Sequence, residues 1–205
     1  MSELKDLENI QTTLNYYNQN AKEFSESTVH VDFVDTQETF LSYLSLGSYI
    51  LDFGCGSGRD TKYFLDHGYQ VRAIDGSESL CKMASSYTGI LVEQILFQDL
   101  NEVEIYDGIW ACSSILHLNR NDLIGVLIKM ERALKKNGII YTSFKYGDFE
   151  GMRNGRYFIN FTEDTFIKLL KEIPSLKIEK TWISGDVREG RGDERWLNIL
   201  LKKKN

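Results

Sequence analysis

The sequence predicts an α/β fold: a doubly wound, Rossmann-like sheet of seven mainly parallel strands with helices on both faces. Three observations lead to this prediction. Short apolar runs alternate with helical patterns from residue 48 onward, which is the element order of a parallel sheet. A glycine-rich turn follows the first apolar run and leads directly into a helix. The last two runs are joined by a loop instead of a helix, so we expect the final strand to run antiparallel.

The first half of the chain supplies most of the expected sheet. Two helices precede it, at about 13–24 and 36–46, and Gly47 ends the second. Residues 48–53 form a continuous apolar run, as in a strand that is buried on both faces. Helices are expected at 58–68 and 77–87, the second with Ser77 as its N-cap, and further strands at 69–75, 90–97 and 106–114.

The second half contains the clearest helical pattern. From 121 to 136 apolar residues recur on one helix face, at Leu123, Leu127, Met130 and Leu134. Asn137-Gly138 is expected to end this helix and to open a strand at 138–144. Thr162 is a predicted N-cap, with Phe161 and Phe166 at the positions of a hydrophobic staple. The last strands are expected around 176–183 and 194–201.

Composition narrows the class of protein. The chain of 205 residues, with 42% hydrophobic residues, predicts a single domain over 1–205, in which a helical lid (1–47) covers a core (48–205). A net charge of -6 argues against nucleic acid as a partner. The polar N-terminus and the absence of a run of about 20 apolar residues argue against a signal peptide and a membrane span. Three dispersed cysteines indicate a reducing, cytoplasmic location. No metal is expected, because the His and Cys residues do not have the spacing of a metal site. The oligomeric state stays open.

The segment ILDFGCGSGRD carries the strongest functional signal. Gly54, Gly56 and Gly58 follow a buried strand and permit close approach of a ligand to the backbone. Asp52, two residues before Gly54, would repel a pyrophosphate and suits a cationic ligand. Asp75 ends the next strand, where an acid commonly accepts hydrogen bonds from ribose hydroxyls. A third acid, Asp99, is expected at the same edge of the sheet.

On these residues the chain resembles the class I S-adenosylmethionine-dependent methyltransferases. The resemblance runs from YYNQNAKEFSEST to DERWLNILL, and points to the small bacterial branch near the tellurite-resistance and small-molecule methyltransferases. It implies S-adenosylmethionine as cofactor, S-adenosylhomocysteine as product and a small-molecule acceptor. The chemistry would be an in-line displacement at a sulfonium, for which aromatic faces such as those of Tyr16, Tyr17, Trp110 and Tyr146 can stabilise charge.

The resemblance also assigns residues to the parts of the cofactor. The glycine loop, including Cys55, would back the methionine part, with Asp52 at its edge. Asp75, beside Gly76, would hold the ribose. Asp99 and the backbone of Leu100 would meet the adenine, and Ala111 to Ser113, including Cys112, would line the methionine end. Tyr17 belongs to a YxxxAxxF-like spacing with Ala21 and Phe24 on the first helix, which covers the cofactor in similar proteins.

The acceptor side is indicated by cationic residues in the second half. Arginines gather in GMRNGRYF and DVREGRGDERW, and Lys145 and Tyr146 follow the fifth strand. Arginine forks suit a carboxylate or a phosphate, so we hypothesise a small anionic acceptor held by Arg156 with one or more of Arg188, Arg191 and Arg195. A solvated network with Glu189, Asp193 and Glu194 is the alternative. His117 is a further acceptor-site candidate, with packing or helix capping as its alternative, and no catalytic residue is assigned.

Two other functions remain open on the sequence alone. One is a catalytically inactive module that binds S-adenosylmethionine. The other is a nicotinamide-dependent oxidoreductase, for which Asp75 and the glycine loop would serve equally well. Asp52 and the GxGxG spacing favour the methyltransferase over the oxidoreductase.

Overall fold

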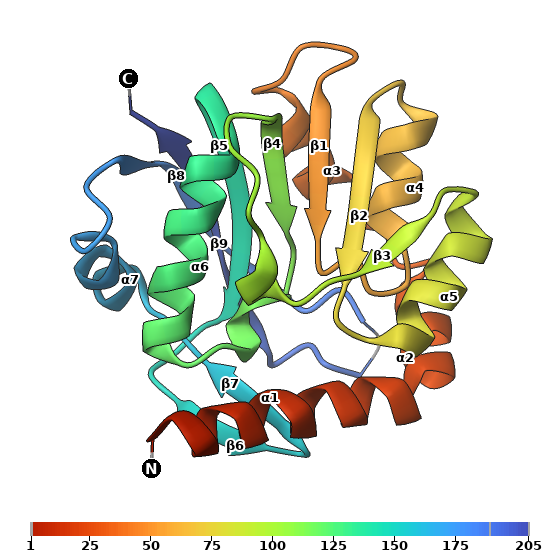
Figure 1. Ribbon diagram of the computed structural model, residues 1–205, viewed down its shortest axis with the longest axis vertical. Helices are drawn as coiled ribbons and strands as arrows, with labels where there is room; N and C mark the ends of the chain where they lie inside the picture. Colours follow the sequence, from red (N-terminus) through yellow and green to blue (C-terminus); the bar gives the residue numbers. More distant parts are fainter. Residues whose placement is uncertain (1, 189, 205) are drawn as a thin grey trace.

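The computed structural model describes residues 2–188 and 190–204, and a seven-stranded sheet forms its centre (Figure 1). The strand order is β3-β2-β1-β4-β5-β9-β8, and β9 alone runs antiparallel to both of its neighbours. The predicted fold class is therefore confirmed, including the direction of the last strand. The strands are β1 (Tyr49–Phe53), β2 (Gln70–Asp75), β3 (Val92–Gln94), β4 (Tyr106–Ala111), β5 (Leu134–Lys145), β8 (Leu176–Gly185) and β9 (Arg195–Lys203).

Helices cover both faces of the sheet. Neighbouring strand residues point to opposite sides, so buried strands present apolar side chains to the helices on each face. Ile109 packs in the larger core cluster under α6 and α7, whereas the adjacent Trp110 packs on the other face with Phe40 of α3 and Phe64 of α4. None of the described helices is long and apolar enough to cross a membrane. The helices are α1 (Ser2–Gln19), α2 (Ala21–Thr28), α3 (Val34–Leu41), α4 (Arg59–Asp66), α5 (Glu78–Thr88), α6 (Arg120–Ala133) and α7 (Glu163–Leu170), with 3₁₀ turns at Phe97–Asp99 and Ile115–His117.

Several predicted boundaries were wrong. The first predicted helix is interrupted at Asn20, which separates α1 from α2. The helix expected to reach 136 ends at Ala133, because Leu134 pairs with Tyr106 of β4 and so belongs to β5. The strand expected over 90–97 is only Val92–Gln94, and the chain then turns into the 3₁₀ segment at the sheet edge.

The predicted helix starts are confirmed by their hydrogen bonds. The Ser77 hydroxyl accepts from the backbone N–H of Leu80. Thr162 and Thr165 form a reciprocal capping box at the start of α7. The staple residues Phe161 and Phe166 meet edge to face, with ring centroids 5.4 Å apart. Local sequence signals are sufficient here, since each cap is made within four residues.

A small hairpin was missed by the sequence analysis. It consists of β6 (Glu150–Arg153) and β7 (Arg156–Ile159), which pair only with each other. Its two turn residues, Asn154 and Gly155, have φ angles of 51° and 74°. Two consecutive positive φ angles define the type I′ hairpin turn, for which Asn-Gly is the preferred sequence. The Asn154-Gly155 dipeptide is thus a sequence signal from which this hairpin could have been predicted.

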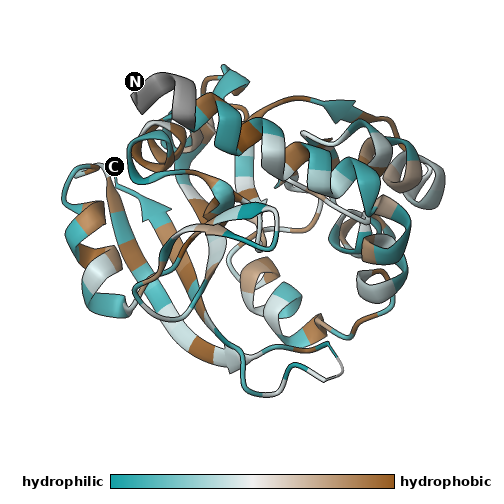
Figure 2. Ribbon diagram, turned by 90° about the horizontal axis from the view of Figure 1, so that it is seen from below, coloured by the Kyte–Doolittle hydropathy of each residue, from teal (hydrophilic) through white to brown (hydrophobic). Residues whose placement is uncertain are grey.

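Helix α1 lies across the edge at which the parallel strands end (Figure 1), and the view onto that edge shows it carrying both hydrophilic and hydrophobic residues (Figure 2). Asn18 fixes it to α5, because its side-chain oxygen accepts from the Ser77 hydroxyl at 2.7 Å. Thr13 fixes it to the hairpin by accepting from the backbone N–H of Tyr157 at 3.0 Å. These contacts place α1 over the site described next.

Candidate functional site

A cavity of about 590 Å³ opens at the carboxyl ends of the parallel strands. Its volume is in the usual range for small-molecule sites, and its position is where doubly wound sheets bind ligands. The walls come from α1, the loop between β1 and α4, the ends of β2, β4 and β5, the hairpin and the β8–β9 loop. Segments distant in sequence therefore form one site. Within the described ranges, no group of three or more His, Cys, Asp or Glu side chains is arranged to hold a metal.

The glycine loop forms one wall as the motif predicts. Gly54, Gly56 and Gly58 all have positive φ angles, of 85°, 56° and 80°. A Cβ added at Gly54 would lie 2.5 Å from the Cβ of Ser114, so the chain can pass there only as glycine. Gly54, Cys55 and Gly56 line the cavity, whereas Gly58 does not and instead packs against Thr88 of α5.

Asp75 lies in the cavity wall beside this loop. One of its oxygens accepts from the backbone N–H of Gly56 at 2.9 Å, and the other accepts from the N–H of Ser77 at 2.8 Å. Each carboxylate oxygen keeps a second lone pair for a ligand hydroxyl. Burial raises the pKa of Asp75, and the backbone amides of Ser77, Gly56 and Gly76 oppose that shift. Gly76 also lines the cavity, and α1 approaches it so closely that a Cβ would lie 2.7 Å from Leu14.

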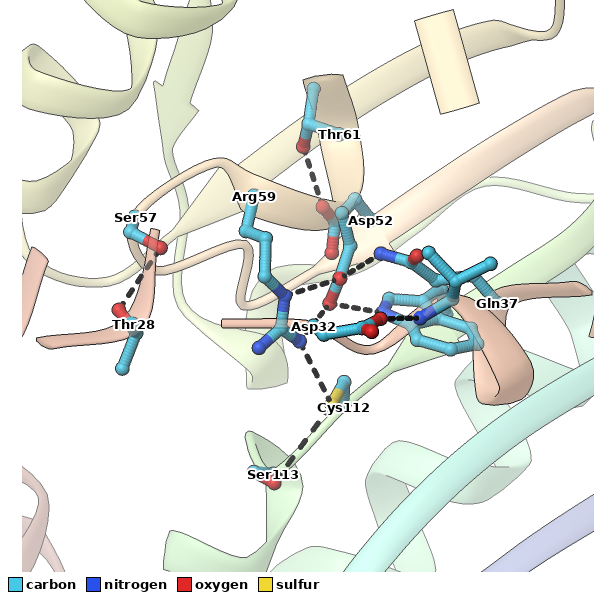
Figure 3. A network of polar contacts seen from close by, with 12 residues as sticks. Thr28, Asp32, Gln37, Asp52, Ser57, Arg59, Thr61, Cys112 and Ser113 are labelled. Atoms are coloured by element: carbon cyan, nitrogen blue, oxygen red, sulfur yellow. Dashed lines mark hydrogen bonds and ion pairs between the residues drawn. The ribbon is translucent and has the colours of Figure 1, made fainter. Parts of the chain in front are cut away.

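Asp52 is placed beneath the glycine loop and does not line the cavity. Its side chain accepts a hydrogen bond from Thr61 at 2.5 Å (Figure 3), and only 2% of the residue is exposed. Burial, together with the nearby negative charge of Asp60, raises its pKa to about 8. The carboxyl group therefore sits one layer behind the surface that a ligand would touch.

A buried network around Asp60 was missed by the sequence analysis. The Asp60 carboxylate accepts from Gln37 at 2.7 Å, from Trp110 Nε1 at 2.8 Å, and from two nitrogens of Arg59 at 2.8 and 2.9 Å. Arg59 is held in the cavity wall, 4.5 Å above the ring of Phe33. Trp110 itself is fully buried on the other side of the sheet, so its proposed contact with a sulfonium was wrong.

Arg59 also reaches the end of β4. Its Nη2 lies 3.9 Å from the Cys112 sulfur (Figure 3). Cys112 and Ser113 line the cavity, but Ala111 is fully buried in the core and does not. Burial raises the pKa of the Cys112 thiol to about 12, and burial likewise raises that of Cys55. The raised pKa of both thiols favours their protonated form at neutral pH, which is the less nucleophilic form.

The two residues expected at the adenine lie outside the cavity wall. Asp99 is exposed at the end of the 3₁₀ segment, and Leu100 is buried in the core. Their neighbours Leu96, Phe97 and Gln98 line the cavity instead. The strand predicted to reach residue 97 ends at Gln94, and the 3₁₀ turn that follows it presents these three side chains.

Tyr17 and His117 meet in the cavity wall. The Tyr17 hydroxyl lies 2.8 Å from Nε2 of His117, and Nδ1 of His117 lies 2.6 Å from the backbone oxygen of Tyr157. The Tyr17 ring packs edge to face on Phe24, with centroids 5.2 Å apart. Burial raises the pKa of Tyr17 and lowers that of His117 to about 4, so both groups are uncharged at neutral pH.

The lining of the cavity is rich in charged side chains. Five carboxylates line the cavity against seven cationic side chains, an excess of positive charge in a chain whose net charge is -6. The carboxylates are those of Asp60, Asp75, Asp186, Asp193 and Glu194, and the cations are Arg59, Lys145, Arg153, Arg156, Arg188, Arg191 and Arg195.

Four of these cations form ion pairs within the protein, with three carboxylates between them. Arg59 is bound by Asp60, as described above, and Arg188 by Asp186 through two hydrogen bonds of 2.9 and 2.5 Å. Glu194 serves both Lys145 and Arg191, the latter at 3.7 Å. Glu189, the other expected partner, lies outside the described residues. Tyr146, which was predicted with Lys145 to lie at the acceptor site, also lines the cavity.

Arg156 differs from these four. It makes no ion pair within 4.0 Å in the described part of the chain, and its buried Nε has no hydrogen-bond partner. Its guanidinium lies 4.2 Å from the ring centroid of Tyr16 and 5.1 Å from that of Phe158. Aromatic faces thus fix its position, and within the described residues its Nε donor stays available for a ligand.

Comparisons with known proteins agree with this geometry. Residues 50–138 match a family model described as a methyltransferase domain. YqeM of Bacillus subtilis (strain 168), named as a methyltransferase, is 32% identical over 111 residues, which cover 48% of this chain and 44% of YqeM. The O-methyltransferase resE of Aspergillus sclerotiorum is 31% identical over 84 residues, or 37% of this chain and 32% of resE. The chain thus spans less than half the length of these curated relatives.

A solved structure matches over nearly the whole chain. The 1,6-didemethyltoxoflavin-N1-methyltransferase of Burkholderia thailandensis, solved with S-adenosylhomocysteine, superposes with a TM-score of 0.79 and 18% identity, covering 98% of this chain and 91% of that one. The narrower placement near the tellurite-resistance branch stays a prediction. By its sheet order and this superposition, the chain has the fold of that S-adenosylhomocysteine-bound methyltransferase, and residues 50–138 are similar to a methyltransferase domain.

Proposed function

We propose that this protein transfers a methyl group from S-adenosylmethionine to a small, anionic acceptor. The observation that carries the proposal is Asp75, which lies in the cavity wall with one backbone donor on each oxygen and free lone pairs beside the glycine loop. That arrangement suits the two hydroxyls of a ribose. When bound, the cofactor supplies an electrophilic methyl group on a sulfonium sulfur.

The residues around Asp75 fit the rest of the cofactor. Leu96 and Phe97 offer apolar surface to an adenine next to the ribose position. At the other end, the Arg59 guanidinium is held by Asp60, and its Nη1 makes no hydrogen bond within the described residues, so it can meet a carboxylate of the methionine part. Tyr17, Gly54 and Cys112 lie between these two ends in the wall.

The acceptor is proposed to bind against the hairpin and the β8–β9 loop. Arg156 favours an anion, because it makes no ion pair among the described residues and is held in place by aromatic rings. Arg188 and Arg191, which are occupied by Asp186 and Glu194, are less available than the sequence suggests. The three free cysteines fit a reducing, cytoplasmic location.

Calorimetry with purified protein tests the cofactor. S-adenosylmethionine and S-adenosylhomocysteine are expected to bind, and NAD is not. Binding of NAD without either adenosyl ligand would favour the nicotinamide-dependent oxidoreductase instead. A screen with labelled S-adenosylmethionine against pools of small metabolites and RNA then tests the activity, and cofactor binding without methylation of any pool would favour the inactive binding module.

Replacing Arg156 tests the nature of the acceptor. Arg156→Ala should leave cofactor affinity and the thermal midpoint nearly unchanged, since the residue makes no ion pair in the described structure, and should lower turnover with acceptors from the active pool. Arg132→Ala, an exposed arginine in α6 outside the cavity, is the matched control. Equal turnover of the two variants would contradict an anionic acceptor at Arg156.

A further inference from the structure

The contact between Tyr17 and His117 joins two elements that are 100 residues apart in sequence. Tyr17 is on α1, and His117 ends the 3₁₀ turn after β4. Both side chains line the cavity, so their hydrogen bond is made at its surface. Capping of α6 is not the role of His117, because Asn119 caps that helix, and packing against Phe158 involves the ring face and leaves the hydrogen bond to Tyr17 to be explained.

The direction of this hydrogen bond follows from the other nitrogen of the ring. A backbone carbonyl can only accept, so the Tyr157 oxygen at 2.6 Å requires a proton on Nδ1 of His117. A neutral imidazole with Nδ1–H has a lone pair on Nε2. The Tyr17 hydroxyl therefore donates to Nε2, and its oxygen, which also faces the Arg156 guanidinium, keeps one lone pair for a proton from the cavity.

The same short strand presents the anion site. Strand β7 supplies the carbonyl of Tyr157 to His117, the ring of Phe158 packed 4.8 Å from the imidazole, and the Arg156 guanidinium 5.8 Å from the Tyr17 ring. An acceptor whose anionic group binds Arg156 would thus lie beside the Tyr17 hydroxyl.

We propose that Tyr17 and His117 form a proton relay that deprotonates the acceptor, which would then carry both an anionic group and an N–H or O–H nucleophile. The inference rests on the proposed function. As the nucleophile bonds to the methyl carbon, the sulfur–carbon bond breaks and its electron pair stays on sulfur. The acceptor proton passes to the oxygen of Tyr17 while the Tyr17 proton passes to Nε2 of His117, leaving an imidazolium bound to the Tyr157 carbonyl. Tyr17 is the catalytic residue, and His117 acts through it.

The charges around His117 link the relay to the acceptor. The groups that face its ring are Tyr17 from α1, Lys145 from β5, and Arg156 with the Tyr157 carbonyl from β7. Burial is the main cause of its lowered pKa, and Arg156 and Lys145 lower it further. An anionic group on Arg156 would offset part of that positive charge, so the imidazole becomes a better proton acceptor when the acceptor is bound.

Nitrogen NMR of the histidine rings tests the geometry without any turnover. In protein labelled with ¹⁵N-histidine, His117→Gln identifies the His117 signals. We expect a neutral ring with its proton on Nδ1 at pH 7, and a change at Nε2 but not at Nδ1 in Tyr17→Phe. A proton on Nε2, an imidazolium at pH 7, or an unchanged Nε2 signal in Tyr17→Phe would overturn the relay.

The pH dependence of methyl transfer tests the chemistry. With the acceptor pool that the wild-type protein methylates, His117→Gln and Tyr17→Phe should lose about 10²–10⁴-fold in rate at pH 7. They should recover about tenfold per pH unit as the acceptor ionises by itself, which a packing role would not produce. A loss of rate that is equal at all pH values would refute the relay. Calorimetry with S-adenosylhomocysteine separates the two proposals, because His117→Gln, which changes a residue not placed against the cofactor, should still bind it if only the relay is affected.

Discussion

Asp75 holds the backbone of the site with one hydrogen bond on each carboxylate oxygen, and it faces the cavity in which we propose that the cofactor binds. Its oxygens hold the backbone of Gly56 and Ser77, and so fix both the glycine loop and the start of α5. Asp75→Ala should weaken S-adenosylhomocysteine binding by about 1.5–3 kcal/mol, because charge-assisted hydrogen bonds to the ribose are lost. Calorimetry measures this change, with Asp66→Ala, an exposed carboxylate of α4, as control. Unchanged affinity in a folded Asp75→Ala protein would contradict the ribose assignment.

Asp52 makes stability depend on pH. Its pKa is raised to about 8 in the folded protein by burial and by Asp60, well above the ordinary value of an aspartate, so the folded state holds this proton more tightly than the unfolded chain does. The stabilising contribution is complete below about pH 4 and is lost as the pH rises toward 8. Denaturant unfolding should therefore show that the stability of Asp52→Asn relative to the wild type increases between pH 5 and 8 and levels off above it. A difference that is constant with pH would contradict an elevated pKa.

The β6–β7 hairpin is the element that decides the character of the acceptor site. It carries Arg156 on one strand, offers the Tyr157 carbonyl to His117, and is fixed to α1 through Thr13. Its turn approaches α1 as well, because a Cβ at Gly155 would lie 3.3 Å from the Tyr16 ring. A small two-stranded element of this kind depends on its tertiary contacts, since an isolated hairpin is marginally stable in water.

Gly155→Ala tests that dependence. The residue has a φ of 74°, which costs a side chain about 1 kcal/mol, and the added methyl group also meets Tyr16. Hydrogen exchange of the hairpin amides should accelerate while the amides of β1 and β4 stay protected. Gly125→Ala, in the exposed face of α6 with nothing within 4 Å, should be neutral or stabilising. Equal protection of the hairpin in both variants would show that the turn does not limit its stability.

At the scale of the whole molecule, α3 belongs to the core although it lies within the predicted lid over 1–47. Phe40 is fully buried, and its ring lies 5.1 Å from Trp110 and 5.8 Å from Phe64. Gly108 of β4 leaves room for it, because a Cβ there would lie 2.7 Å from Phe40 Cζ. We accordingly propose that only α1 and α2 cover the ligand, with α3 as a fixed support of the sheet.

Phe40→Ala should lower the free energy of unfolding by about 3–5 kcal/mol, since it leaves a cavity between α3, α4 and β4. Thermal or denaturant unfolding followed by circular dichroism measures the loss. Tyr43→Ala is the control, because Tyr43 is only three residues away and 40% exposed. A similar small loss in both variants would mean that α3 is not part of the cooperative core.

Local chemistry explains what the sequence by itself determined about this protein. Apolar runs, helix caps and the positive-φ glycines act over a few residues, so the strand alternation, the Ser77 and Thr162 caps and the glycine loop were predictable. The placement of Asp75 at a strand end followed from the same alternation. The antiparallel direction of the final strand was also predictable, because the described part of the connection between β8 and β9 contains no helix that could cross over to a parallel strand.

Only the tertiary structure decided which side chains meet. Leu134 leaves its helix because β4 offers a pairing partner, and the turn after β3 brings Phe97 and Gln98 into the cavity in place of Asp99. The pairing of Arg188 and Arg191 with carboxylates, the freedom of Arg156, and the contact between Tyr17 and His117 all join residues from different elements. Such contacts depend on how elements pack in three dimensions, and no spacing within one segment encodes them.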